Sequence, residues 1–374
     1  MDTPNLDGLK IFGSPSRYIQ GPGATRILPD RLTKLGIEGP ALVVASPSIR
    51  AKLDPVWTET FAAAGRTVVV RTFGGESSDE EIAANVAAVG ECGAAVVVGV
   101  GGGKCLDTVR AVAGTLDLPV VNCPSVASSD APCSALSAVY LPDGTFDHLL
   151  FYEKSAELVL VDTELVAEAP ARLLVSGMGD ALATWFEART VIEARSPNQL
   201  HGSTTLAAGA LARLCYDTLV TDGVAAVQAV EARSVTPALE RIVEANTLLS
   251  GLGFESGGLA IAHSVHNGFT ALGATHAYLH GEKVAFGLLV QLVVEGRPQS
   301  EIEEVMAFCV AVGLPVTLAG IGLADVGASD LQAVAEGTVA EGETAHHEPF
   351  PVTAGMILAG LRAADAAGRA FLAG

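Results

Sequence analysis

Residues 40–123 alternate between short apolar runs and amphipathic stretches. Apolar runs rich in valine lie within residues 40–50 and at residues 68–70 and 94–100, and a shorter valine-rich segment lies at residues 119–123. Strands of a parallel sheet that are covered on both faces show such runs, whereas half-exposed strands alternate apolar and polar residues. The runs therefore predict buried parallel strands.

The stretches between these runs have helical signals. Ser78 and Glu81 have the spacing of a capping box at a helix start, and Leu106, Val109 and Ala113 recur at helical intervals. Strand, turn and helix in repeated order predict a doubly wound α/β domain.

The pattern changes near residue 163 and becomes helical. Met178, Ala181, Leu182, Trp185 and Phe186 follow the i, i+3, i+4, i+7, i+8 spacing of one helix face. Similar patterns continue through residues 201–220 and 236–256, and we find no convincing strand after about residue 165. We predict two domains, an α/β domain at residues 1–164 and an all-helical domain at residues 165–374.

Composition narrows the class of protein. The chain has 374 residues, of which 49% are hydrophobic and only 5% aromatic, so its core is mostly Ala, Val and Leu. Its apolar runs are shorter than the roughly 18 residues of a membrane helix. The start, MDTPNLDGLK, has no basic segment before an apolar one, so we expect no secretory signal. Six cysteines without a CxxC pair predict reduced thiols and a cytoplasmic location.

The net charge of −20 comes from 42 acidic and 22 basic residues. Nucleic acids and anionic membranes repel such a chain, so neither is expected as a partner, and small neutral substrates fit better. Ordinary acidic solubility explains the same charge. The charge therefore excludes partners more than it identifies one.

A glycine-rich turn, Gly101-Gly102-Gly103-Lys104, follows the run at 94–100 and precedes a helix. Glycines let a ligand approach the backbone, and amides at a helix start hold anions. The turn lacks the spacing of GxGxxG and of a P-loop, and a plain tight turn is the alternative. Its place after a buried strand favours a pyrophosphate site. In the next loop, Asp130 is predicted either to contact a ligand hydroxyl or to cap a turn.

Histidines gather in residues 257–287. Four of the chain's 8 histidines fall there: His263, His266, His276 and His280. Two imidazoles and one carboxylate form a three-ligand site for Zn²⁺ or Fe²⁺ with open positions. The spacing alone does not decide which histidines bind.

The carboxylate of such a site also stays open at this stage. Asp180, Glu255 and Glu282 are the candidates, although an aspartate off the apolar stripe, like Asp180, is usually solvated or capping. His346 and His347 are further candidates, but the segment EGETAHHEP is more typical of a solvent-exposed loop.

The chain resembles the glycerol dehydrogenases of the iron-containing alcohol dehydrogenase superfamily, which have the dehydroquinate synthase-like fold. The segments that carry the resemblance spread over most of residues 11–365: FGGESS, GVGGGKCLDT, SSDAPCSALS, GMGDALATWFEA, GLGFESGGLAIAHSVHNGFTAL, HGEKVAFG and AEGET. It implies a Rossmann-like N-terminal domain, a helical C-terminal domain and a site in the cleft between them. It also implies oxidation of glycerol to dihydroxyacetone with hydride transfer to NAD, and a homo-oligomer such as an octamer.

The resemblance assigns roles to residues. Asp180, His263 and His280 would bind the metal, usually zinc and less often iron, and with it the substrate. Asp130 would contact glycerol, and Asp130 and His266 are the expected catalytic residues. His266 is either a proton relay or a support for a metal ligand. The expected cofactor contacts are Ser46, Gly101, Gly102, Gly103, Lys104, Cys105, Ser125, Val126, Ala127, Ser128, Ser134, Leu136 and Tyr140.

Three positions depart from the family pattern. Ser46 stands where an aspartate is common, and Arg50 follows four residues on, so NADP becomes possible beside NAD. Cys105 replaces a usual threonine. The interval from His263 to His280 is one residue shorter than usual, which makes His276 the alternative ligand, although HGEKVAFG favours His280.

Other functions on the same scaffold are alternatives. A dehydroquinate synthase-like lyase or a glycerol-1-phosphate dehydrogenase handles phosphorylated substrates and needs clustered basic residues, but Lys104, Lys154, Arg172 and Lys283 are scattered. A metal-free nucleotide-binding regulator is a third alternative. The complete set of metal ligands argues against it.

Overall fold

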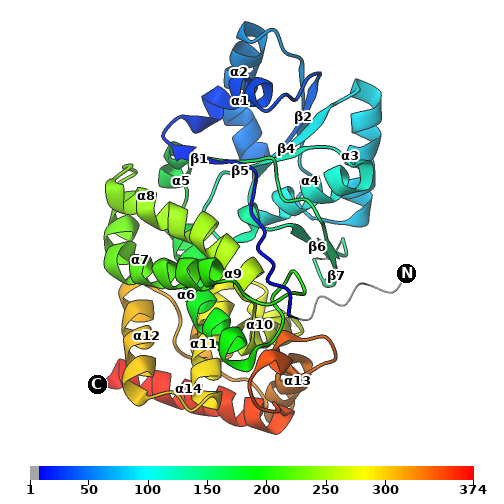
Figure 1. Ribbon diagram of the computed structural model, residues 1–374. Helices are drawn as coiled ribbons and strands as arrows, with labels where there is room; N and C mark the ends of the chain where they lie inside the picture. The colour runs from blue at the N-terminus through cyan, green and yellow to red at the C-terminus, as the bar shows by residue number, and fades with distance from the viewer. Residues whose placement is uncertain (1–7, 143) are drawn as a thin grey trace. The chain divides into compact units, whose positions relative to one another are not determined.

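The computed structural model describes residues 8–142 and 144–374 (Figure 1). Residues 1–7, at which no secretory signal is expected, lie outside this range. The chain divides into two compact units. We call Ser14–Pro170 with Ala229–Leu248 the α/β unit, and the chain up to Gly13, Ala171–Gln228 and Leu249–Gly374 the helical unit. The division differs from a single cut at residue 164 mainly because residues 229–248 pack with the α/β unit.

The α/β unit contains a 6-stranded sheet in the order β1-β8-β5-β4-β2-β3, and all its pairs are parallel. This confirms the predicted doubly wound sheet. The strands are β1 (Tyr18–Gly21), β2 (Ala41–Ala45), β3 (Val68–Thr72), β4 (Val96–Gly101), β5 (Val120–Pro124) and β8 (Leu158–Asp162).

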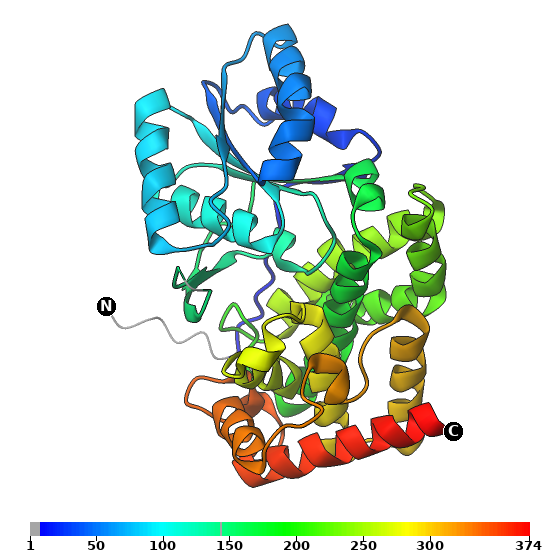
Figure 2. The ribbon, with the colours of Figure 1, turned by 180° about the vertical axis from the view of Figure 1, so that it is seen from behind.

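Helices cover both faces of this sheet (Figures 1 and 2). Helices α1 (Leu28–Lys34) and α2 (Pro47–Ala63) lie on one face, and α3 (Asp79–Cys92) and α4 (Gly103–Leu116) lie on the other. Alternate residues of each strand point to opposite faces. Val43 and Val98 accordingly share a buried cluster with Trp57 of α2. Two covered faces explain why the strand sequences are apolar without alternation.

The sequence prediction omits β8, although this strand is fully buried and mainly apolar, and it omits two further parts of the α/β unit. The first is β1, which pairs only with β8 at the sheet edge and is only half buried. The second is an antiparallel hairpin of β6 (Leu136–Tyr140) and β7 (Phe146–Phe151). Exposure lets both segments carry polar residues, so neither has a continuous apolar run.

The predicted capping box is half formed. The Ser78 hydroxyl accepts the amide of Glu81 at 3.3 Å, as the motif requires. The Glu81 carboxylate does not return to Ser78; it accepts from the Gly74 amide at 3.1 Å and from Asn85 at 3.0 Å. The same carboxylate therefore ties the preceding turn to the helix.

The helical unit contains no named strand in the part of the chain that the structure describes, as the sequence predicts. Three short helices lie mainly or wholly within the α/β unit: α5 (Thr163–Glu168), α8 (Pro237–Glu244) and the π-helix η3 (Ala245–Leu249). The longer helices of the helical unit are α6 (Ala171–Ala194), α7 (Leu206–Glu231), α9 (Ser250–Gly257), α10 (Ile261–Thr270), α11 (His280–Val294), α12 (Gln299–Val312), α13 (Ala328–Thr338) and α14 (Ala354–Ala373).

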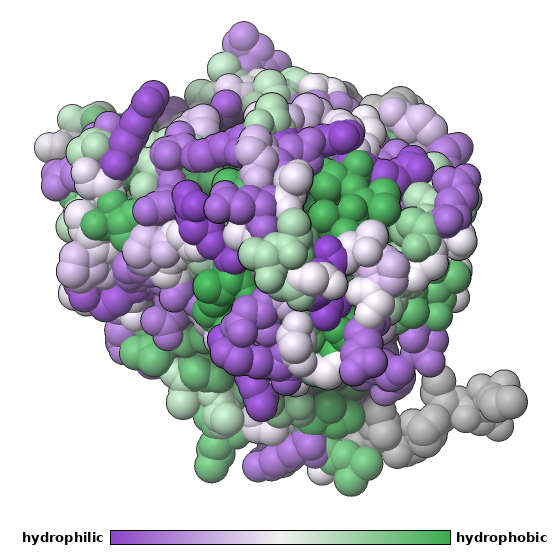
Figure 3. Space-filling model, turned by 90° about the horizontal axis from the view of Figure 1, so that it is seen from above, coloured by the Kyte–Doolittle hydropathy of each residue, from purple (hydrophilic) through white to green (hydrophobic). Residues whose placement is uncertain are grey.

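Polar residues predominate on the face that Figure 3 shows, with apolar residues in smaller patches between them. This agrees with a net charge of −20. Among the described residues, no helix combines the length and the hydropathy that spanning a membrane requires.

Helices α6 and α11 touch backbone to backbone at Gly179 and Gly281. A Cβ atom on Gly281 would overlap the carbonyl oxygen of Ser176, and one on Gly179 would overlap the carbonyl oxygen of Gly281. The Gly281 amide also donates to the Ser176 hydroxyl at 3.2 Å. Asp180 follows Gly179 and His280 precedes Gly281, so this contact brings the two side chains together.

We predict that Gly281→Ala lowers the free energy of unfolding by about 3 kcal/mol, because the added methyl group overpacks a backbone contact. Chemical denaturation of the metal-free protein measures this loss. Gly355→Ala in α14 is the control, since its Cβ would meet only the Thr353 hydroxyl at 3.9 Å. Equal stability of the two variants would contradict the close helix contact.

Candidate metal centre

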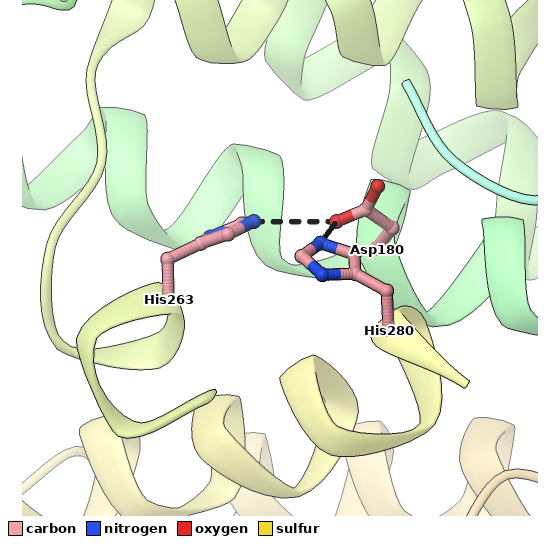
Figure 4. Close-up of side chains that lie close together, drawn as sticks. All are labelled: Asp180, His263 and His280. Carbon is pink, nitrogen blue, oxygen red and sulfur yellow. Dashed lines mark hydrogen bonds and ion pairs between the residues drawn. The ribbon is translucent and has the colours of Figure 1, made fainter. Parts of the chain in front are cut away.

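Asp180, His263 and His280 come together from α6, α10 and α11 (Figure 4). The Oδ1 atom of Asp180 lies 3.2 Å from Nε2 of His263 and 3.0 Å from Nε2 of His280. One possible ligand atom from each residue lies within 4.8 Å of the other two. Across residues 8–142 and 144–374, this is the one group of three His, Cys, Asp or Glu side chains with that geometry.

The geometry of this group fits a small divalent cation. Ligand atoms at tetrahedral zinc lie about 3.4 Å from one another, close to the observed separations. Asp180 is fully buried. Burial alone would raise the pKa of its carboxyl, but the His280 and His263 imidazoles hold that pKa well below its usual range. The carboxylate therefore stays charged inside the protein, which a cation ligand requires.

The sequence pattern suggests a solvated or capping role for Asp180, and the structure contradicts that role. Asp180 lies off the apolar stripe because its partners are imidazoles, which approach from α10 and α11. These helices are distant in sequence, so no local signal identifies them.

The outer nitrogens of both histidines have partners. Nδ1 of His263 lies 2.6 Å from the Glu187 carboxylate, and Nδ1 of His280 lies 3.0 Å from Nε2 of His266. Burial, then the neighbouring His280, lowers the pKa of His266 well below its usual value, so this imidazole is neutral. Glu187 belongs to no motif; its only sequence signal is that it follows Asp180 by about two helical turns.

The alternative ligands lie outside this group. His276 belongs to the connection before α11, where its Nε2 donates to the Thr270 carbonyl at 2.9 Å. Two nitrogens of Arg172 bind the Glu282 carboxylate, at 2.6 and 2.8 Å. Glu255 is buried in α9. The structure thus brings His280 rather than His276 to Asp180.

The segment around His346 is not simply an exposed loop. Residues Thr344–His347 form a 3-10 helix, in which Ala345 is buried and His346 is exposed. His347 donates from Nδ1 to the Leu259 carbonyl at 2.9 Å, and the Thr344 hydroxyl donates to the Ala260 carbonyl at 2.8 Å. These hydrogen bonds fix the segment against the turn before α10.

In the α/β unit, the predicted cofactor residues follow three neighbouring strands. β4 lies between β2 and β5, with Val100 opposite Ala45 and Gly101 opposite Pro124. The Ser46 amide donates to the Val100 carbonyl at 3.1 Å, which places Ser46 beside the glycine turn. The strand order reverses between β2 and β4, and open α/β sheets bind ligands beyond the strand ends at such a point.

Gly102 and Gly103 leave space at the start of α4. A Cβ on Gly102 would meet only Val126 at 3.7 Å, and one on Gly103 would meet only the Ser129 hydroxyl at 3.7 Å. Neither has a positive φ, and no side chain caps the helix. The packing and conformation of this chain therefore do not demand glycine at these positions. An anion could approach the helix start there.

Other predicted cofactor residues are already engaged by the chain. Lys104 pairs with Glu76 at 2.5 Å and lies 4.7 Å from the centre of the Tyr140 ring. The Cys105 thiol is buried and donates to the Val44 carbonyl at 3.4 Å, and burial raises its pKa to about 12. The thiol packs beside Gly101 and β2.

The serine loop after β5 is also fixed. The Ser125 amide donates to the Gly101 carbonyl at 3.0 Å, and the Ala127 carbonyl accepts from Asn246 at 2.9 Å. Ser128 is half buried, and the Ser134 hydroxyl donates to the Ala131 carbonyl at 3.0 Å. Leu136 and Tyr140 are the first and last residues of β6.

Asp130 is buried at the start of a 3-10 turn, Ala131–Cys133. The loop is anchored by Arg110, which donates to the Ala131 carbonyl at 2.7 Å and forms a buried pair with Asp107. The sequence pattern does not reveal this anchor, since Arg110 and Asp107 lie on an otherwise apolar helix.

Comparison with known proteins agrees with this description. The sequence model of the iron-containing alcohol dehydrogenase family matches residues 15–163. The chain is 53% identical to a glycerol dehydrogenase of Thermotoga maritima, over 95% of this chain and 96% of that protein. It is 46% identical to a glycolaldehyde reductase of Halobacterium salinarum, over 96% of this chain and 98% of that protein.

A solved structure extends the likeness to the fold. The crystal structure of glycerol dehydrogenase from Schizosaccharomyces pombe superposes with a TM-score of 0.94 at 36% identity, covering 98% of this chain and 93% of that chain. The chain therefore belongs to the iron-containing alcohol dehydrogenase family of oxidoreductases, in the group that contains the glycerol dehydrogenases.

Proposed function

We propose that this protein oxidises glycerol, or a related vicinal diol, at the secondary hydroxyl and transfers the hydride to a nicotinamide cofactor. One observation carries the proposal. The Asp180, His263 and His280 side chains converge in a chain that is 53% identical to a glycerol dehydrogenase. The reaction converts glycerol and the oxidised cofactor to dihydroxyacetone, the reduced cofactor and a proton.

Asp180, His263 and His280 would hold a divalent metal. Two imidazoles with one carboxylate suit zinc or ferrous iron, and the resemblance to the glycerol dehydrogenases favours zinc. When bound, the metal would supply Lewis-acid chemistry that lowers the pKa of a substrate hydroxyl. The protein contributes a charged, fully buried Asp180 and two Nε2 atoms directed at it. These atoms would also position the substrate.

The α/β unit would bind the cofactor at the glycine turn. Gly102 and Gly103 leave room for a pyrophosphate at the start of α4, where helix amides favour an anion. The Ser125–Ser128 segment, Ser134, Leu136 and Tyr140 would complete this site. Asp130 would contact a glycerol hydroxyl.

His266 has two proposed roles, proton relay and support for His280. Its contacts favour support, because Nε2 faces Nδ1 of His280 at 3.0 Å and Nδ1 faces Asn267 at 3.2 Å. With both ring nitrogens engaged, His266 has no nitrogen directed at a substrate.

Ser46 bears on the preference between NAD and NADP. We propose that the site accepts NADP as well as NAD. A carboxylate at the end of this strand would hold the ribose hydroxyls and repel a 2′-phosphate. Ser46 removes that repulsion. Arg50 lies four residues on; it binds the Thr72 hydroxyl at 2.7 Å and Asp54 at 3.2 Å.

The phosphate-substrate alternatives lack support. Three of the four basic residues considered for a phosphate site pair with carboxylates: Lys104 with Glu76, Lys154 with Asp117, and Arg172 with Glu282. A second candidate activity is reduction of glycolaldehyde, which the Halobacterium salinarum relative favours. Reduction of a small hydroxyaldehyde uses the same hydride chemistry in the opposite direction.

We also propose that the protein is a cytoplasmic homo-oligomer, such as an octamer. The cysteines support the location, since all six are free thiols and five of them are buried. The resemblance to the glycerol dehydrogenases supports the assembly.

Zinc-loaded protein is expected to reduce NAD or NADP when glycerol is added. Removing the metal with a chelator should abolish that rate, and zinc should restore it, because no protein side chain replaces a Lewis acid. Cofactor absorbance at 340 nm (a property of the reduced nicotinamide) measures the rate. Zinc-loaded protein that acts on no diol, triol or hydroxyaldehyde would overturn the proposed function.

Gly102→Val should weaken NAD binding by about tenfold or more, since the side chain would occupy the space left for the pyrophosphate. Thermal stability should change little, because a Cβ there meets only Val126 at 3.7 Å. Calorimetric titration measures the affinity. The control is Gly90→Val in α3, where a Cβ meets nothing within 4 Å. Unchanged binding by Gly102→Val would remove the turn from the cofactor site.

Ser46→Asp should shift the ratio of kcat/KM for NAD over NADP upward by about tenfold or more. The added carboxylate would accept the ribose hydroxyls and repel the 2′-phosphate. Ser48→Asp, an exposed position in the first turn of α2, adds the same charge nearby as a control. If both variants shift preference equally, or neither does, Ser46 does not contact the ribose.

A further inference from the structure

The two histidines of the metal centre present the same ring nitrogen to Asp180. Nε2 of His263 and Nε2 of His280 both face Oδ1 of Asp180. A neutral imidazole has its proton on one nitrogen, and only the other nitrogen has a lone pair for a metal. To bind a metal through Nε2, each ring must therefore have a proton on Nδ1 and none on Nε2, and the structure shows what holds the Nδ1 proton.

The ring of His263 lies between two carboxylates of one helix. Asp180 and Glu187 are seven residues apart on α6, which places them on the same face two turns apart, and both are fully buried. Asp180 faces Nε2, and Glu187 Oε2 lies 2.6 Å from Nδ1.

The orientation of Glu187 is fixed by its other oxygen. Oε1 accepts the backbone amides of Ala260 at 2.9 Å and His263 at 3.1 Å. A carboxylate only accepts hydrogen bonds, so Nδ1 of His263 must donate to Oε2. Nε2 of the same ring faces the Asp180 carboxylate, so without a metal it donates to Asp180. A metal bound beside Asp180 would displace that Nε2 proton, while Glu187 retains the proton on Nδ1.

The ring of His280 is held by a chain of three residues. Nδ1 of His280 lies 3.0 Å from Nε2 of His266, and Nδ1 of His266 lies 3.2 Å from Oδ1 of Asn267. The Asn267 amide donates to both carboxylate oxygens of Glu343, at 3.3 and 3.1 Å.

The order of donors in this chain begins at Glu343. Because the Glu343 carboxylate accepts, Asn267 turns its NH₂ group toward it and its oxygen toward His266. His266 then donates from Nδ1 and accepts at Nε2, so His280 donates from Nδ1. Nε2 of His280 faces the acceptor Asp180, so its proton is the one that a metal bound there would displace.

We propose that Glu187 and the Asn267–Glu343 pair are positioning residues that set the tautomers of His263 and His280, so that both offer Nε2 to a divalent metal beside Asp180. The proposal rests on the proposed metal centre. Outer hydrogen bonds to ligand histidines of this kind raise metal affinity. None of these three residues touches the substrate in this role.

Glu187 and the Asn267–Glu343 pair do not contribute equally to metal affinity. Glu187 is fully buried, so water cannot replace its carboxylate, whereas Asn267 is exposed and water can accept the proton of His266. Loss of Glu187 should therefore weaken metal binding far more than loss of Asn267.

The decisive variant is Glu187→Gln. The glutamine oxygen would still accept the amides of Ala260 and His263, which forces its NH₂ group toward Nδ1 of His263. That nitrogen must then accept, so the single proton of the neutral ring is on Nε2, where it donates to Asp180. The metal-free protein keeps all its hydrogen bonds, but the ligand nitrogen is blocked.

Zinc affinity of the metal-free protein, measured by competition with a chromophoric chelator, should fall about 10–100-fold in Glu187→Gln. The melting temperature of the metal-free variant should stay close to that of the unmodified protein. Asn267→Leu should show a smaller loss of zinc affinity. In the cobalt-substituted protein, the d–d absorption should change in Glu187→Gln, because a nitrogen ligand is lost or altered.

The control is Glu193→Gln, the same substitution on the same helix, where the carboxylate pairs with Arg297 at 2.9 Å. Its zinc affinity should be unchanged. Zinc affinity of Glu187→Gln within twofold of the unmodified protein would overturn the proposal, as would an equal loss in both variants. Failure of the unmodified protein to bind zinc would instead overturn the proposed function.

Discussion

The buried carboxylate of Asp180 is the interaction on which the proposed site depends. A fully buried charge is costly unless partners compensate it, and here two imidazoles do so. They reach it because α6 and α11 touch through glycine, with Gly179 and Gly281 adjacent to Asp180 and His280. The backbone contact and the charged site are thus parts of one arrangement, since a side chain at either glycine would move the helices apart.

The two units would bind their ligands through different kinds of interaction. In the α/β unit, the strand order of the parallel sheet reverses between β2 and β4. The helix after β4 begins with open glycines and no capping side chain, which favours an anion. In the helical unit, hydrogen-bonded side chains orient ring nitrogens toward a carboxylate. Family membership explains why both features occur in one chain, since an oxidoreductase of this family requires a hydride acceptor and an activated hydroxyl.

Much of the fold could be predicted because the signals are local. The apolar runs at β2 and β4 are continuous since helices cover both faces of the sheet. β1 could not be found, because it is half exposed at an edge and its partner β8 lies far along the chain. The same limit applies to the site. The sequence pattern around Asp180 is typical of a solvated residue, because its partners lie on α10 and α11, far along the chain. Glu187, Asn267 and Glu343 belong to no motif that shows their hydrogen-bond partners.

The most direct test of this account is the position of the metal itself. Crystals of the zinc-loaded protein, measured at wavelengths on both sides of the zinc absorption edge, would locate the ion by anomalous difference density. The account predicts one strong peak within bonding distance of a carboxylate oxygen of Asp180 and of Nε2 in both His263 and His280. A peak at Nδ1 of either ring, at His276, or away from Asp180 would contradict it.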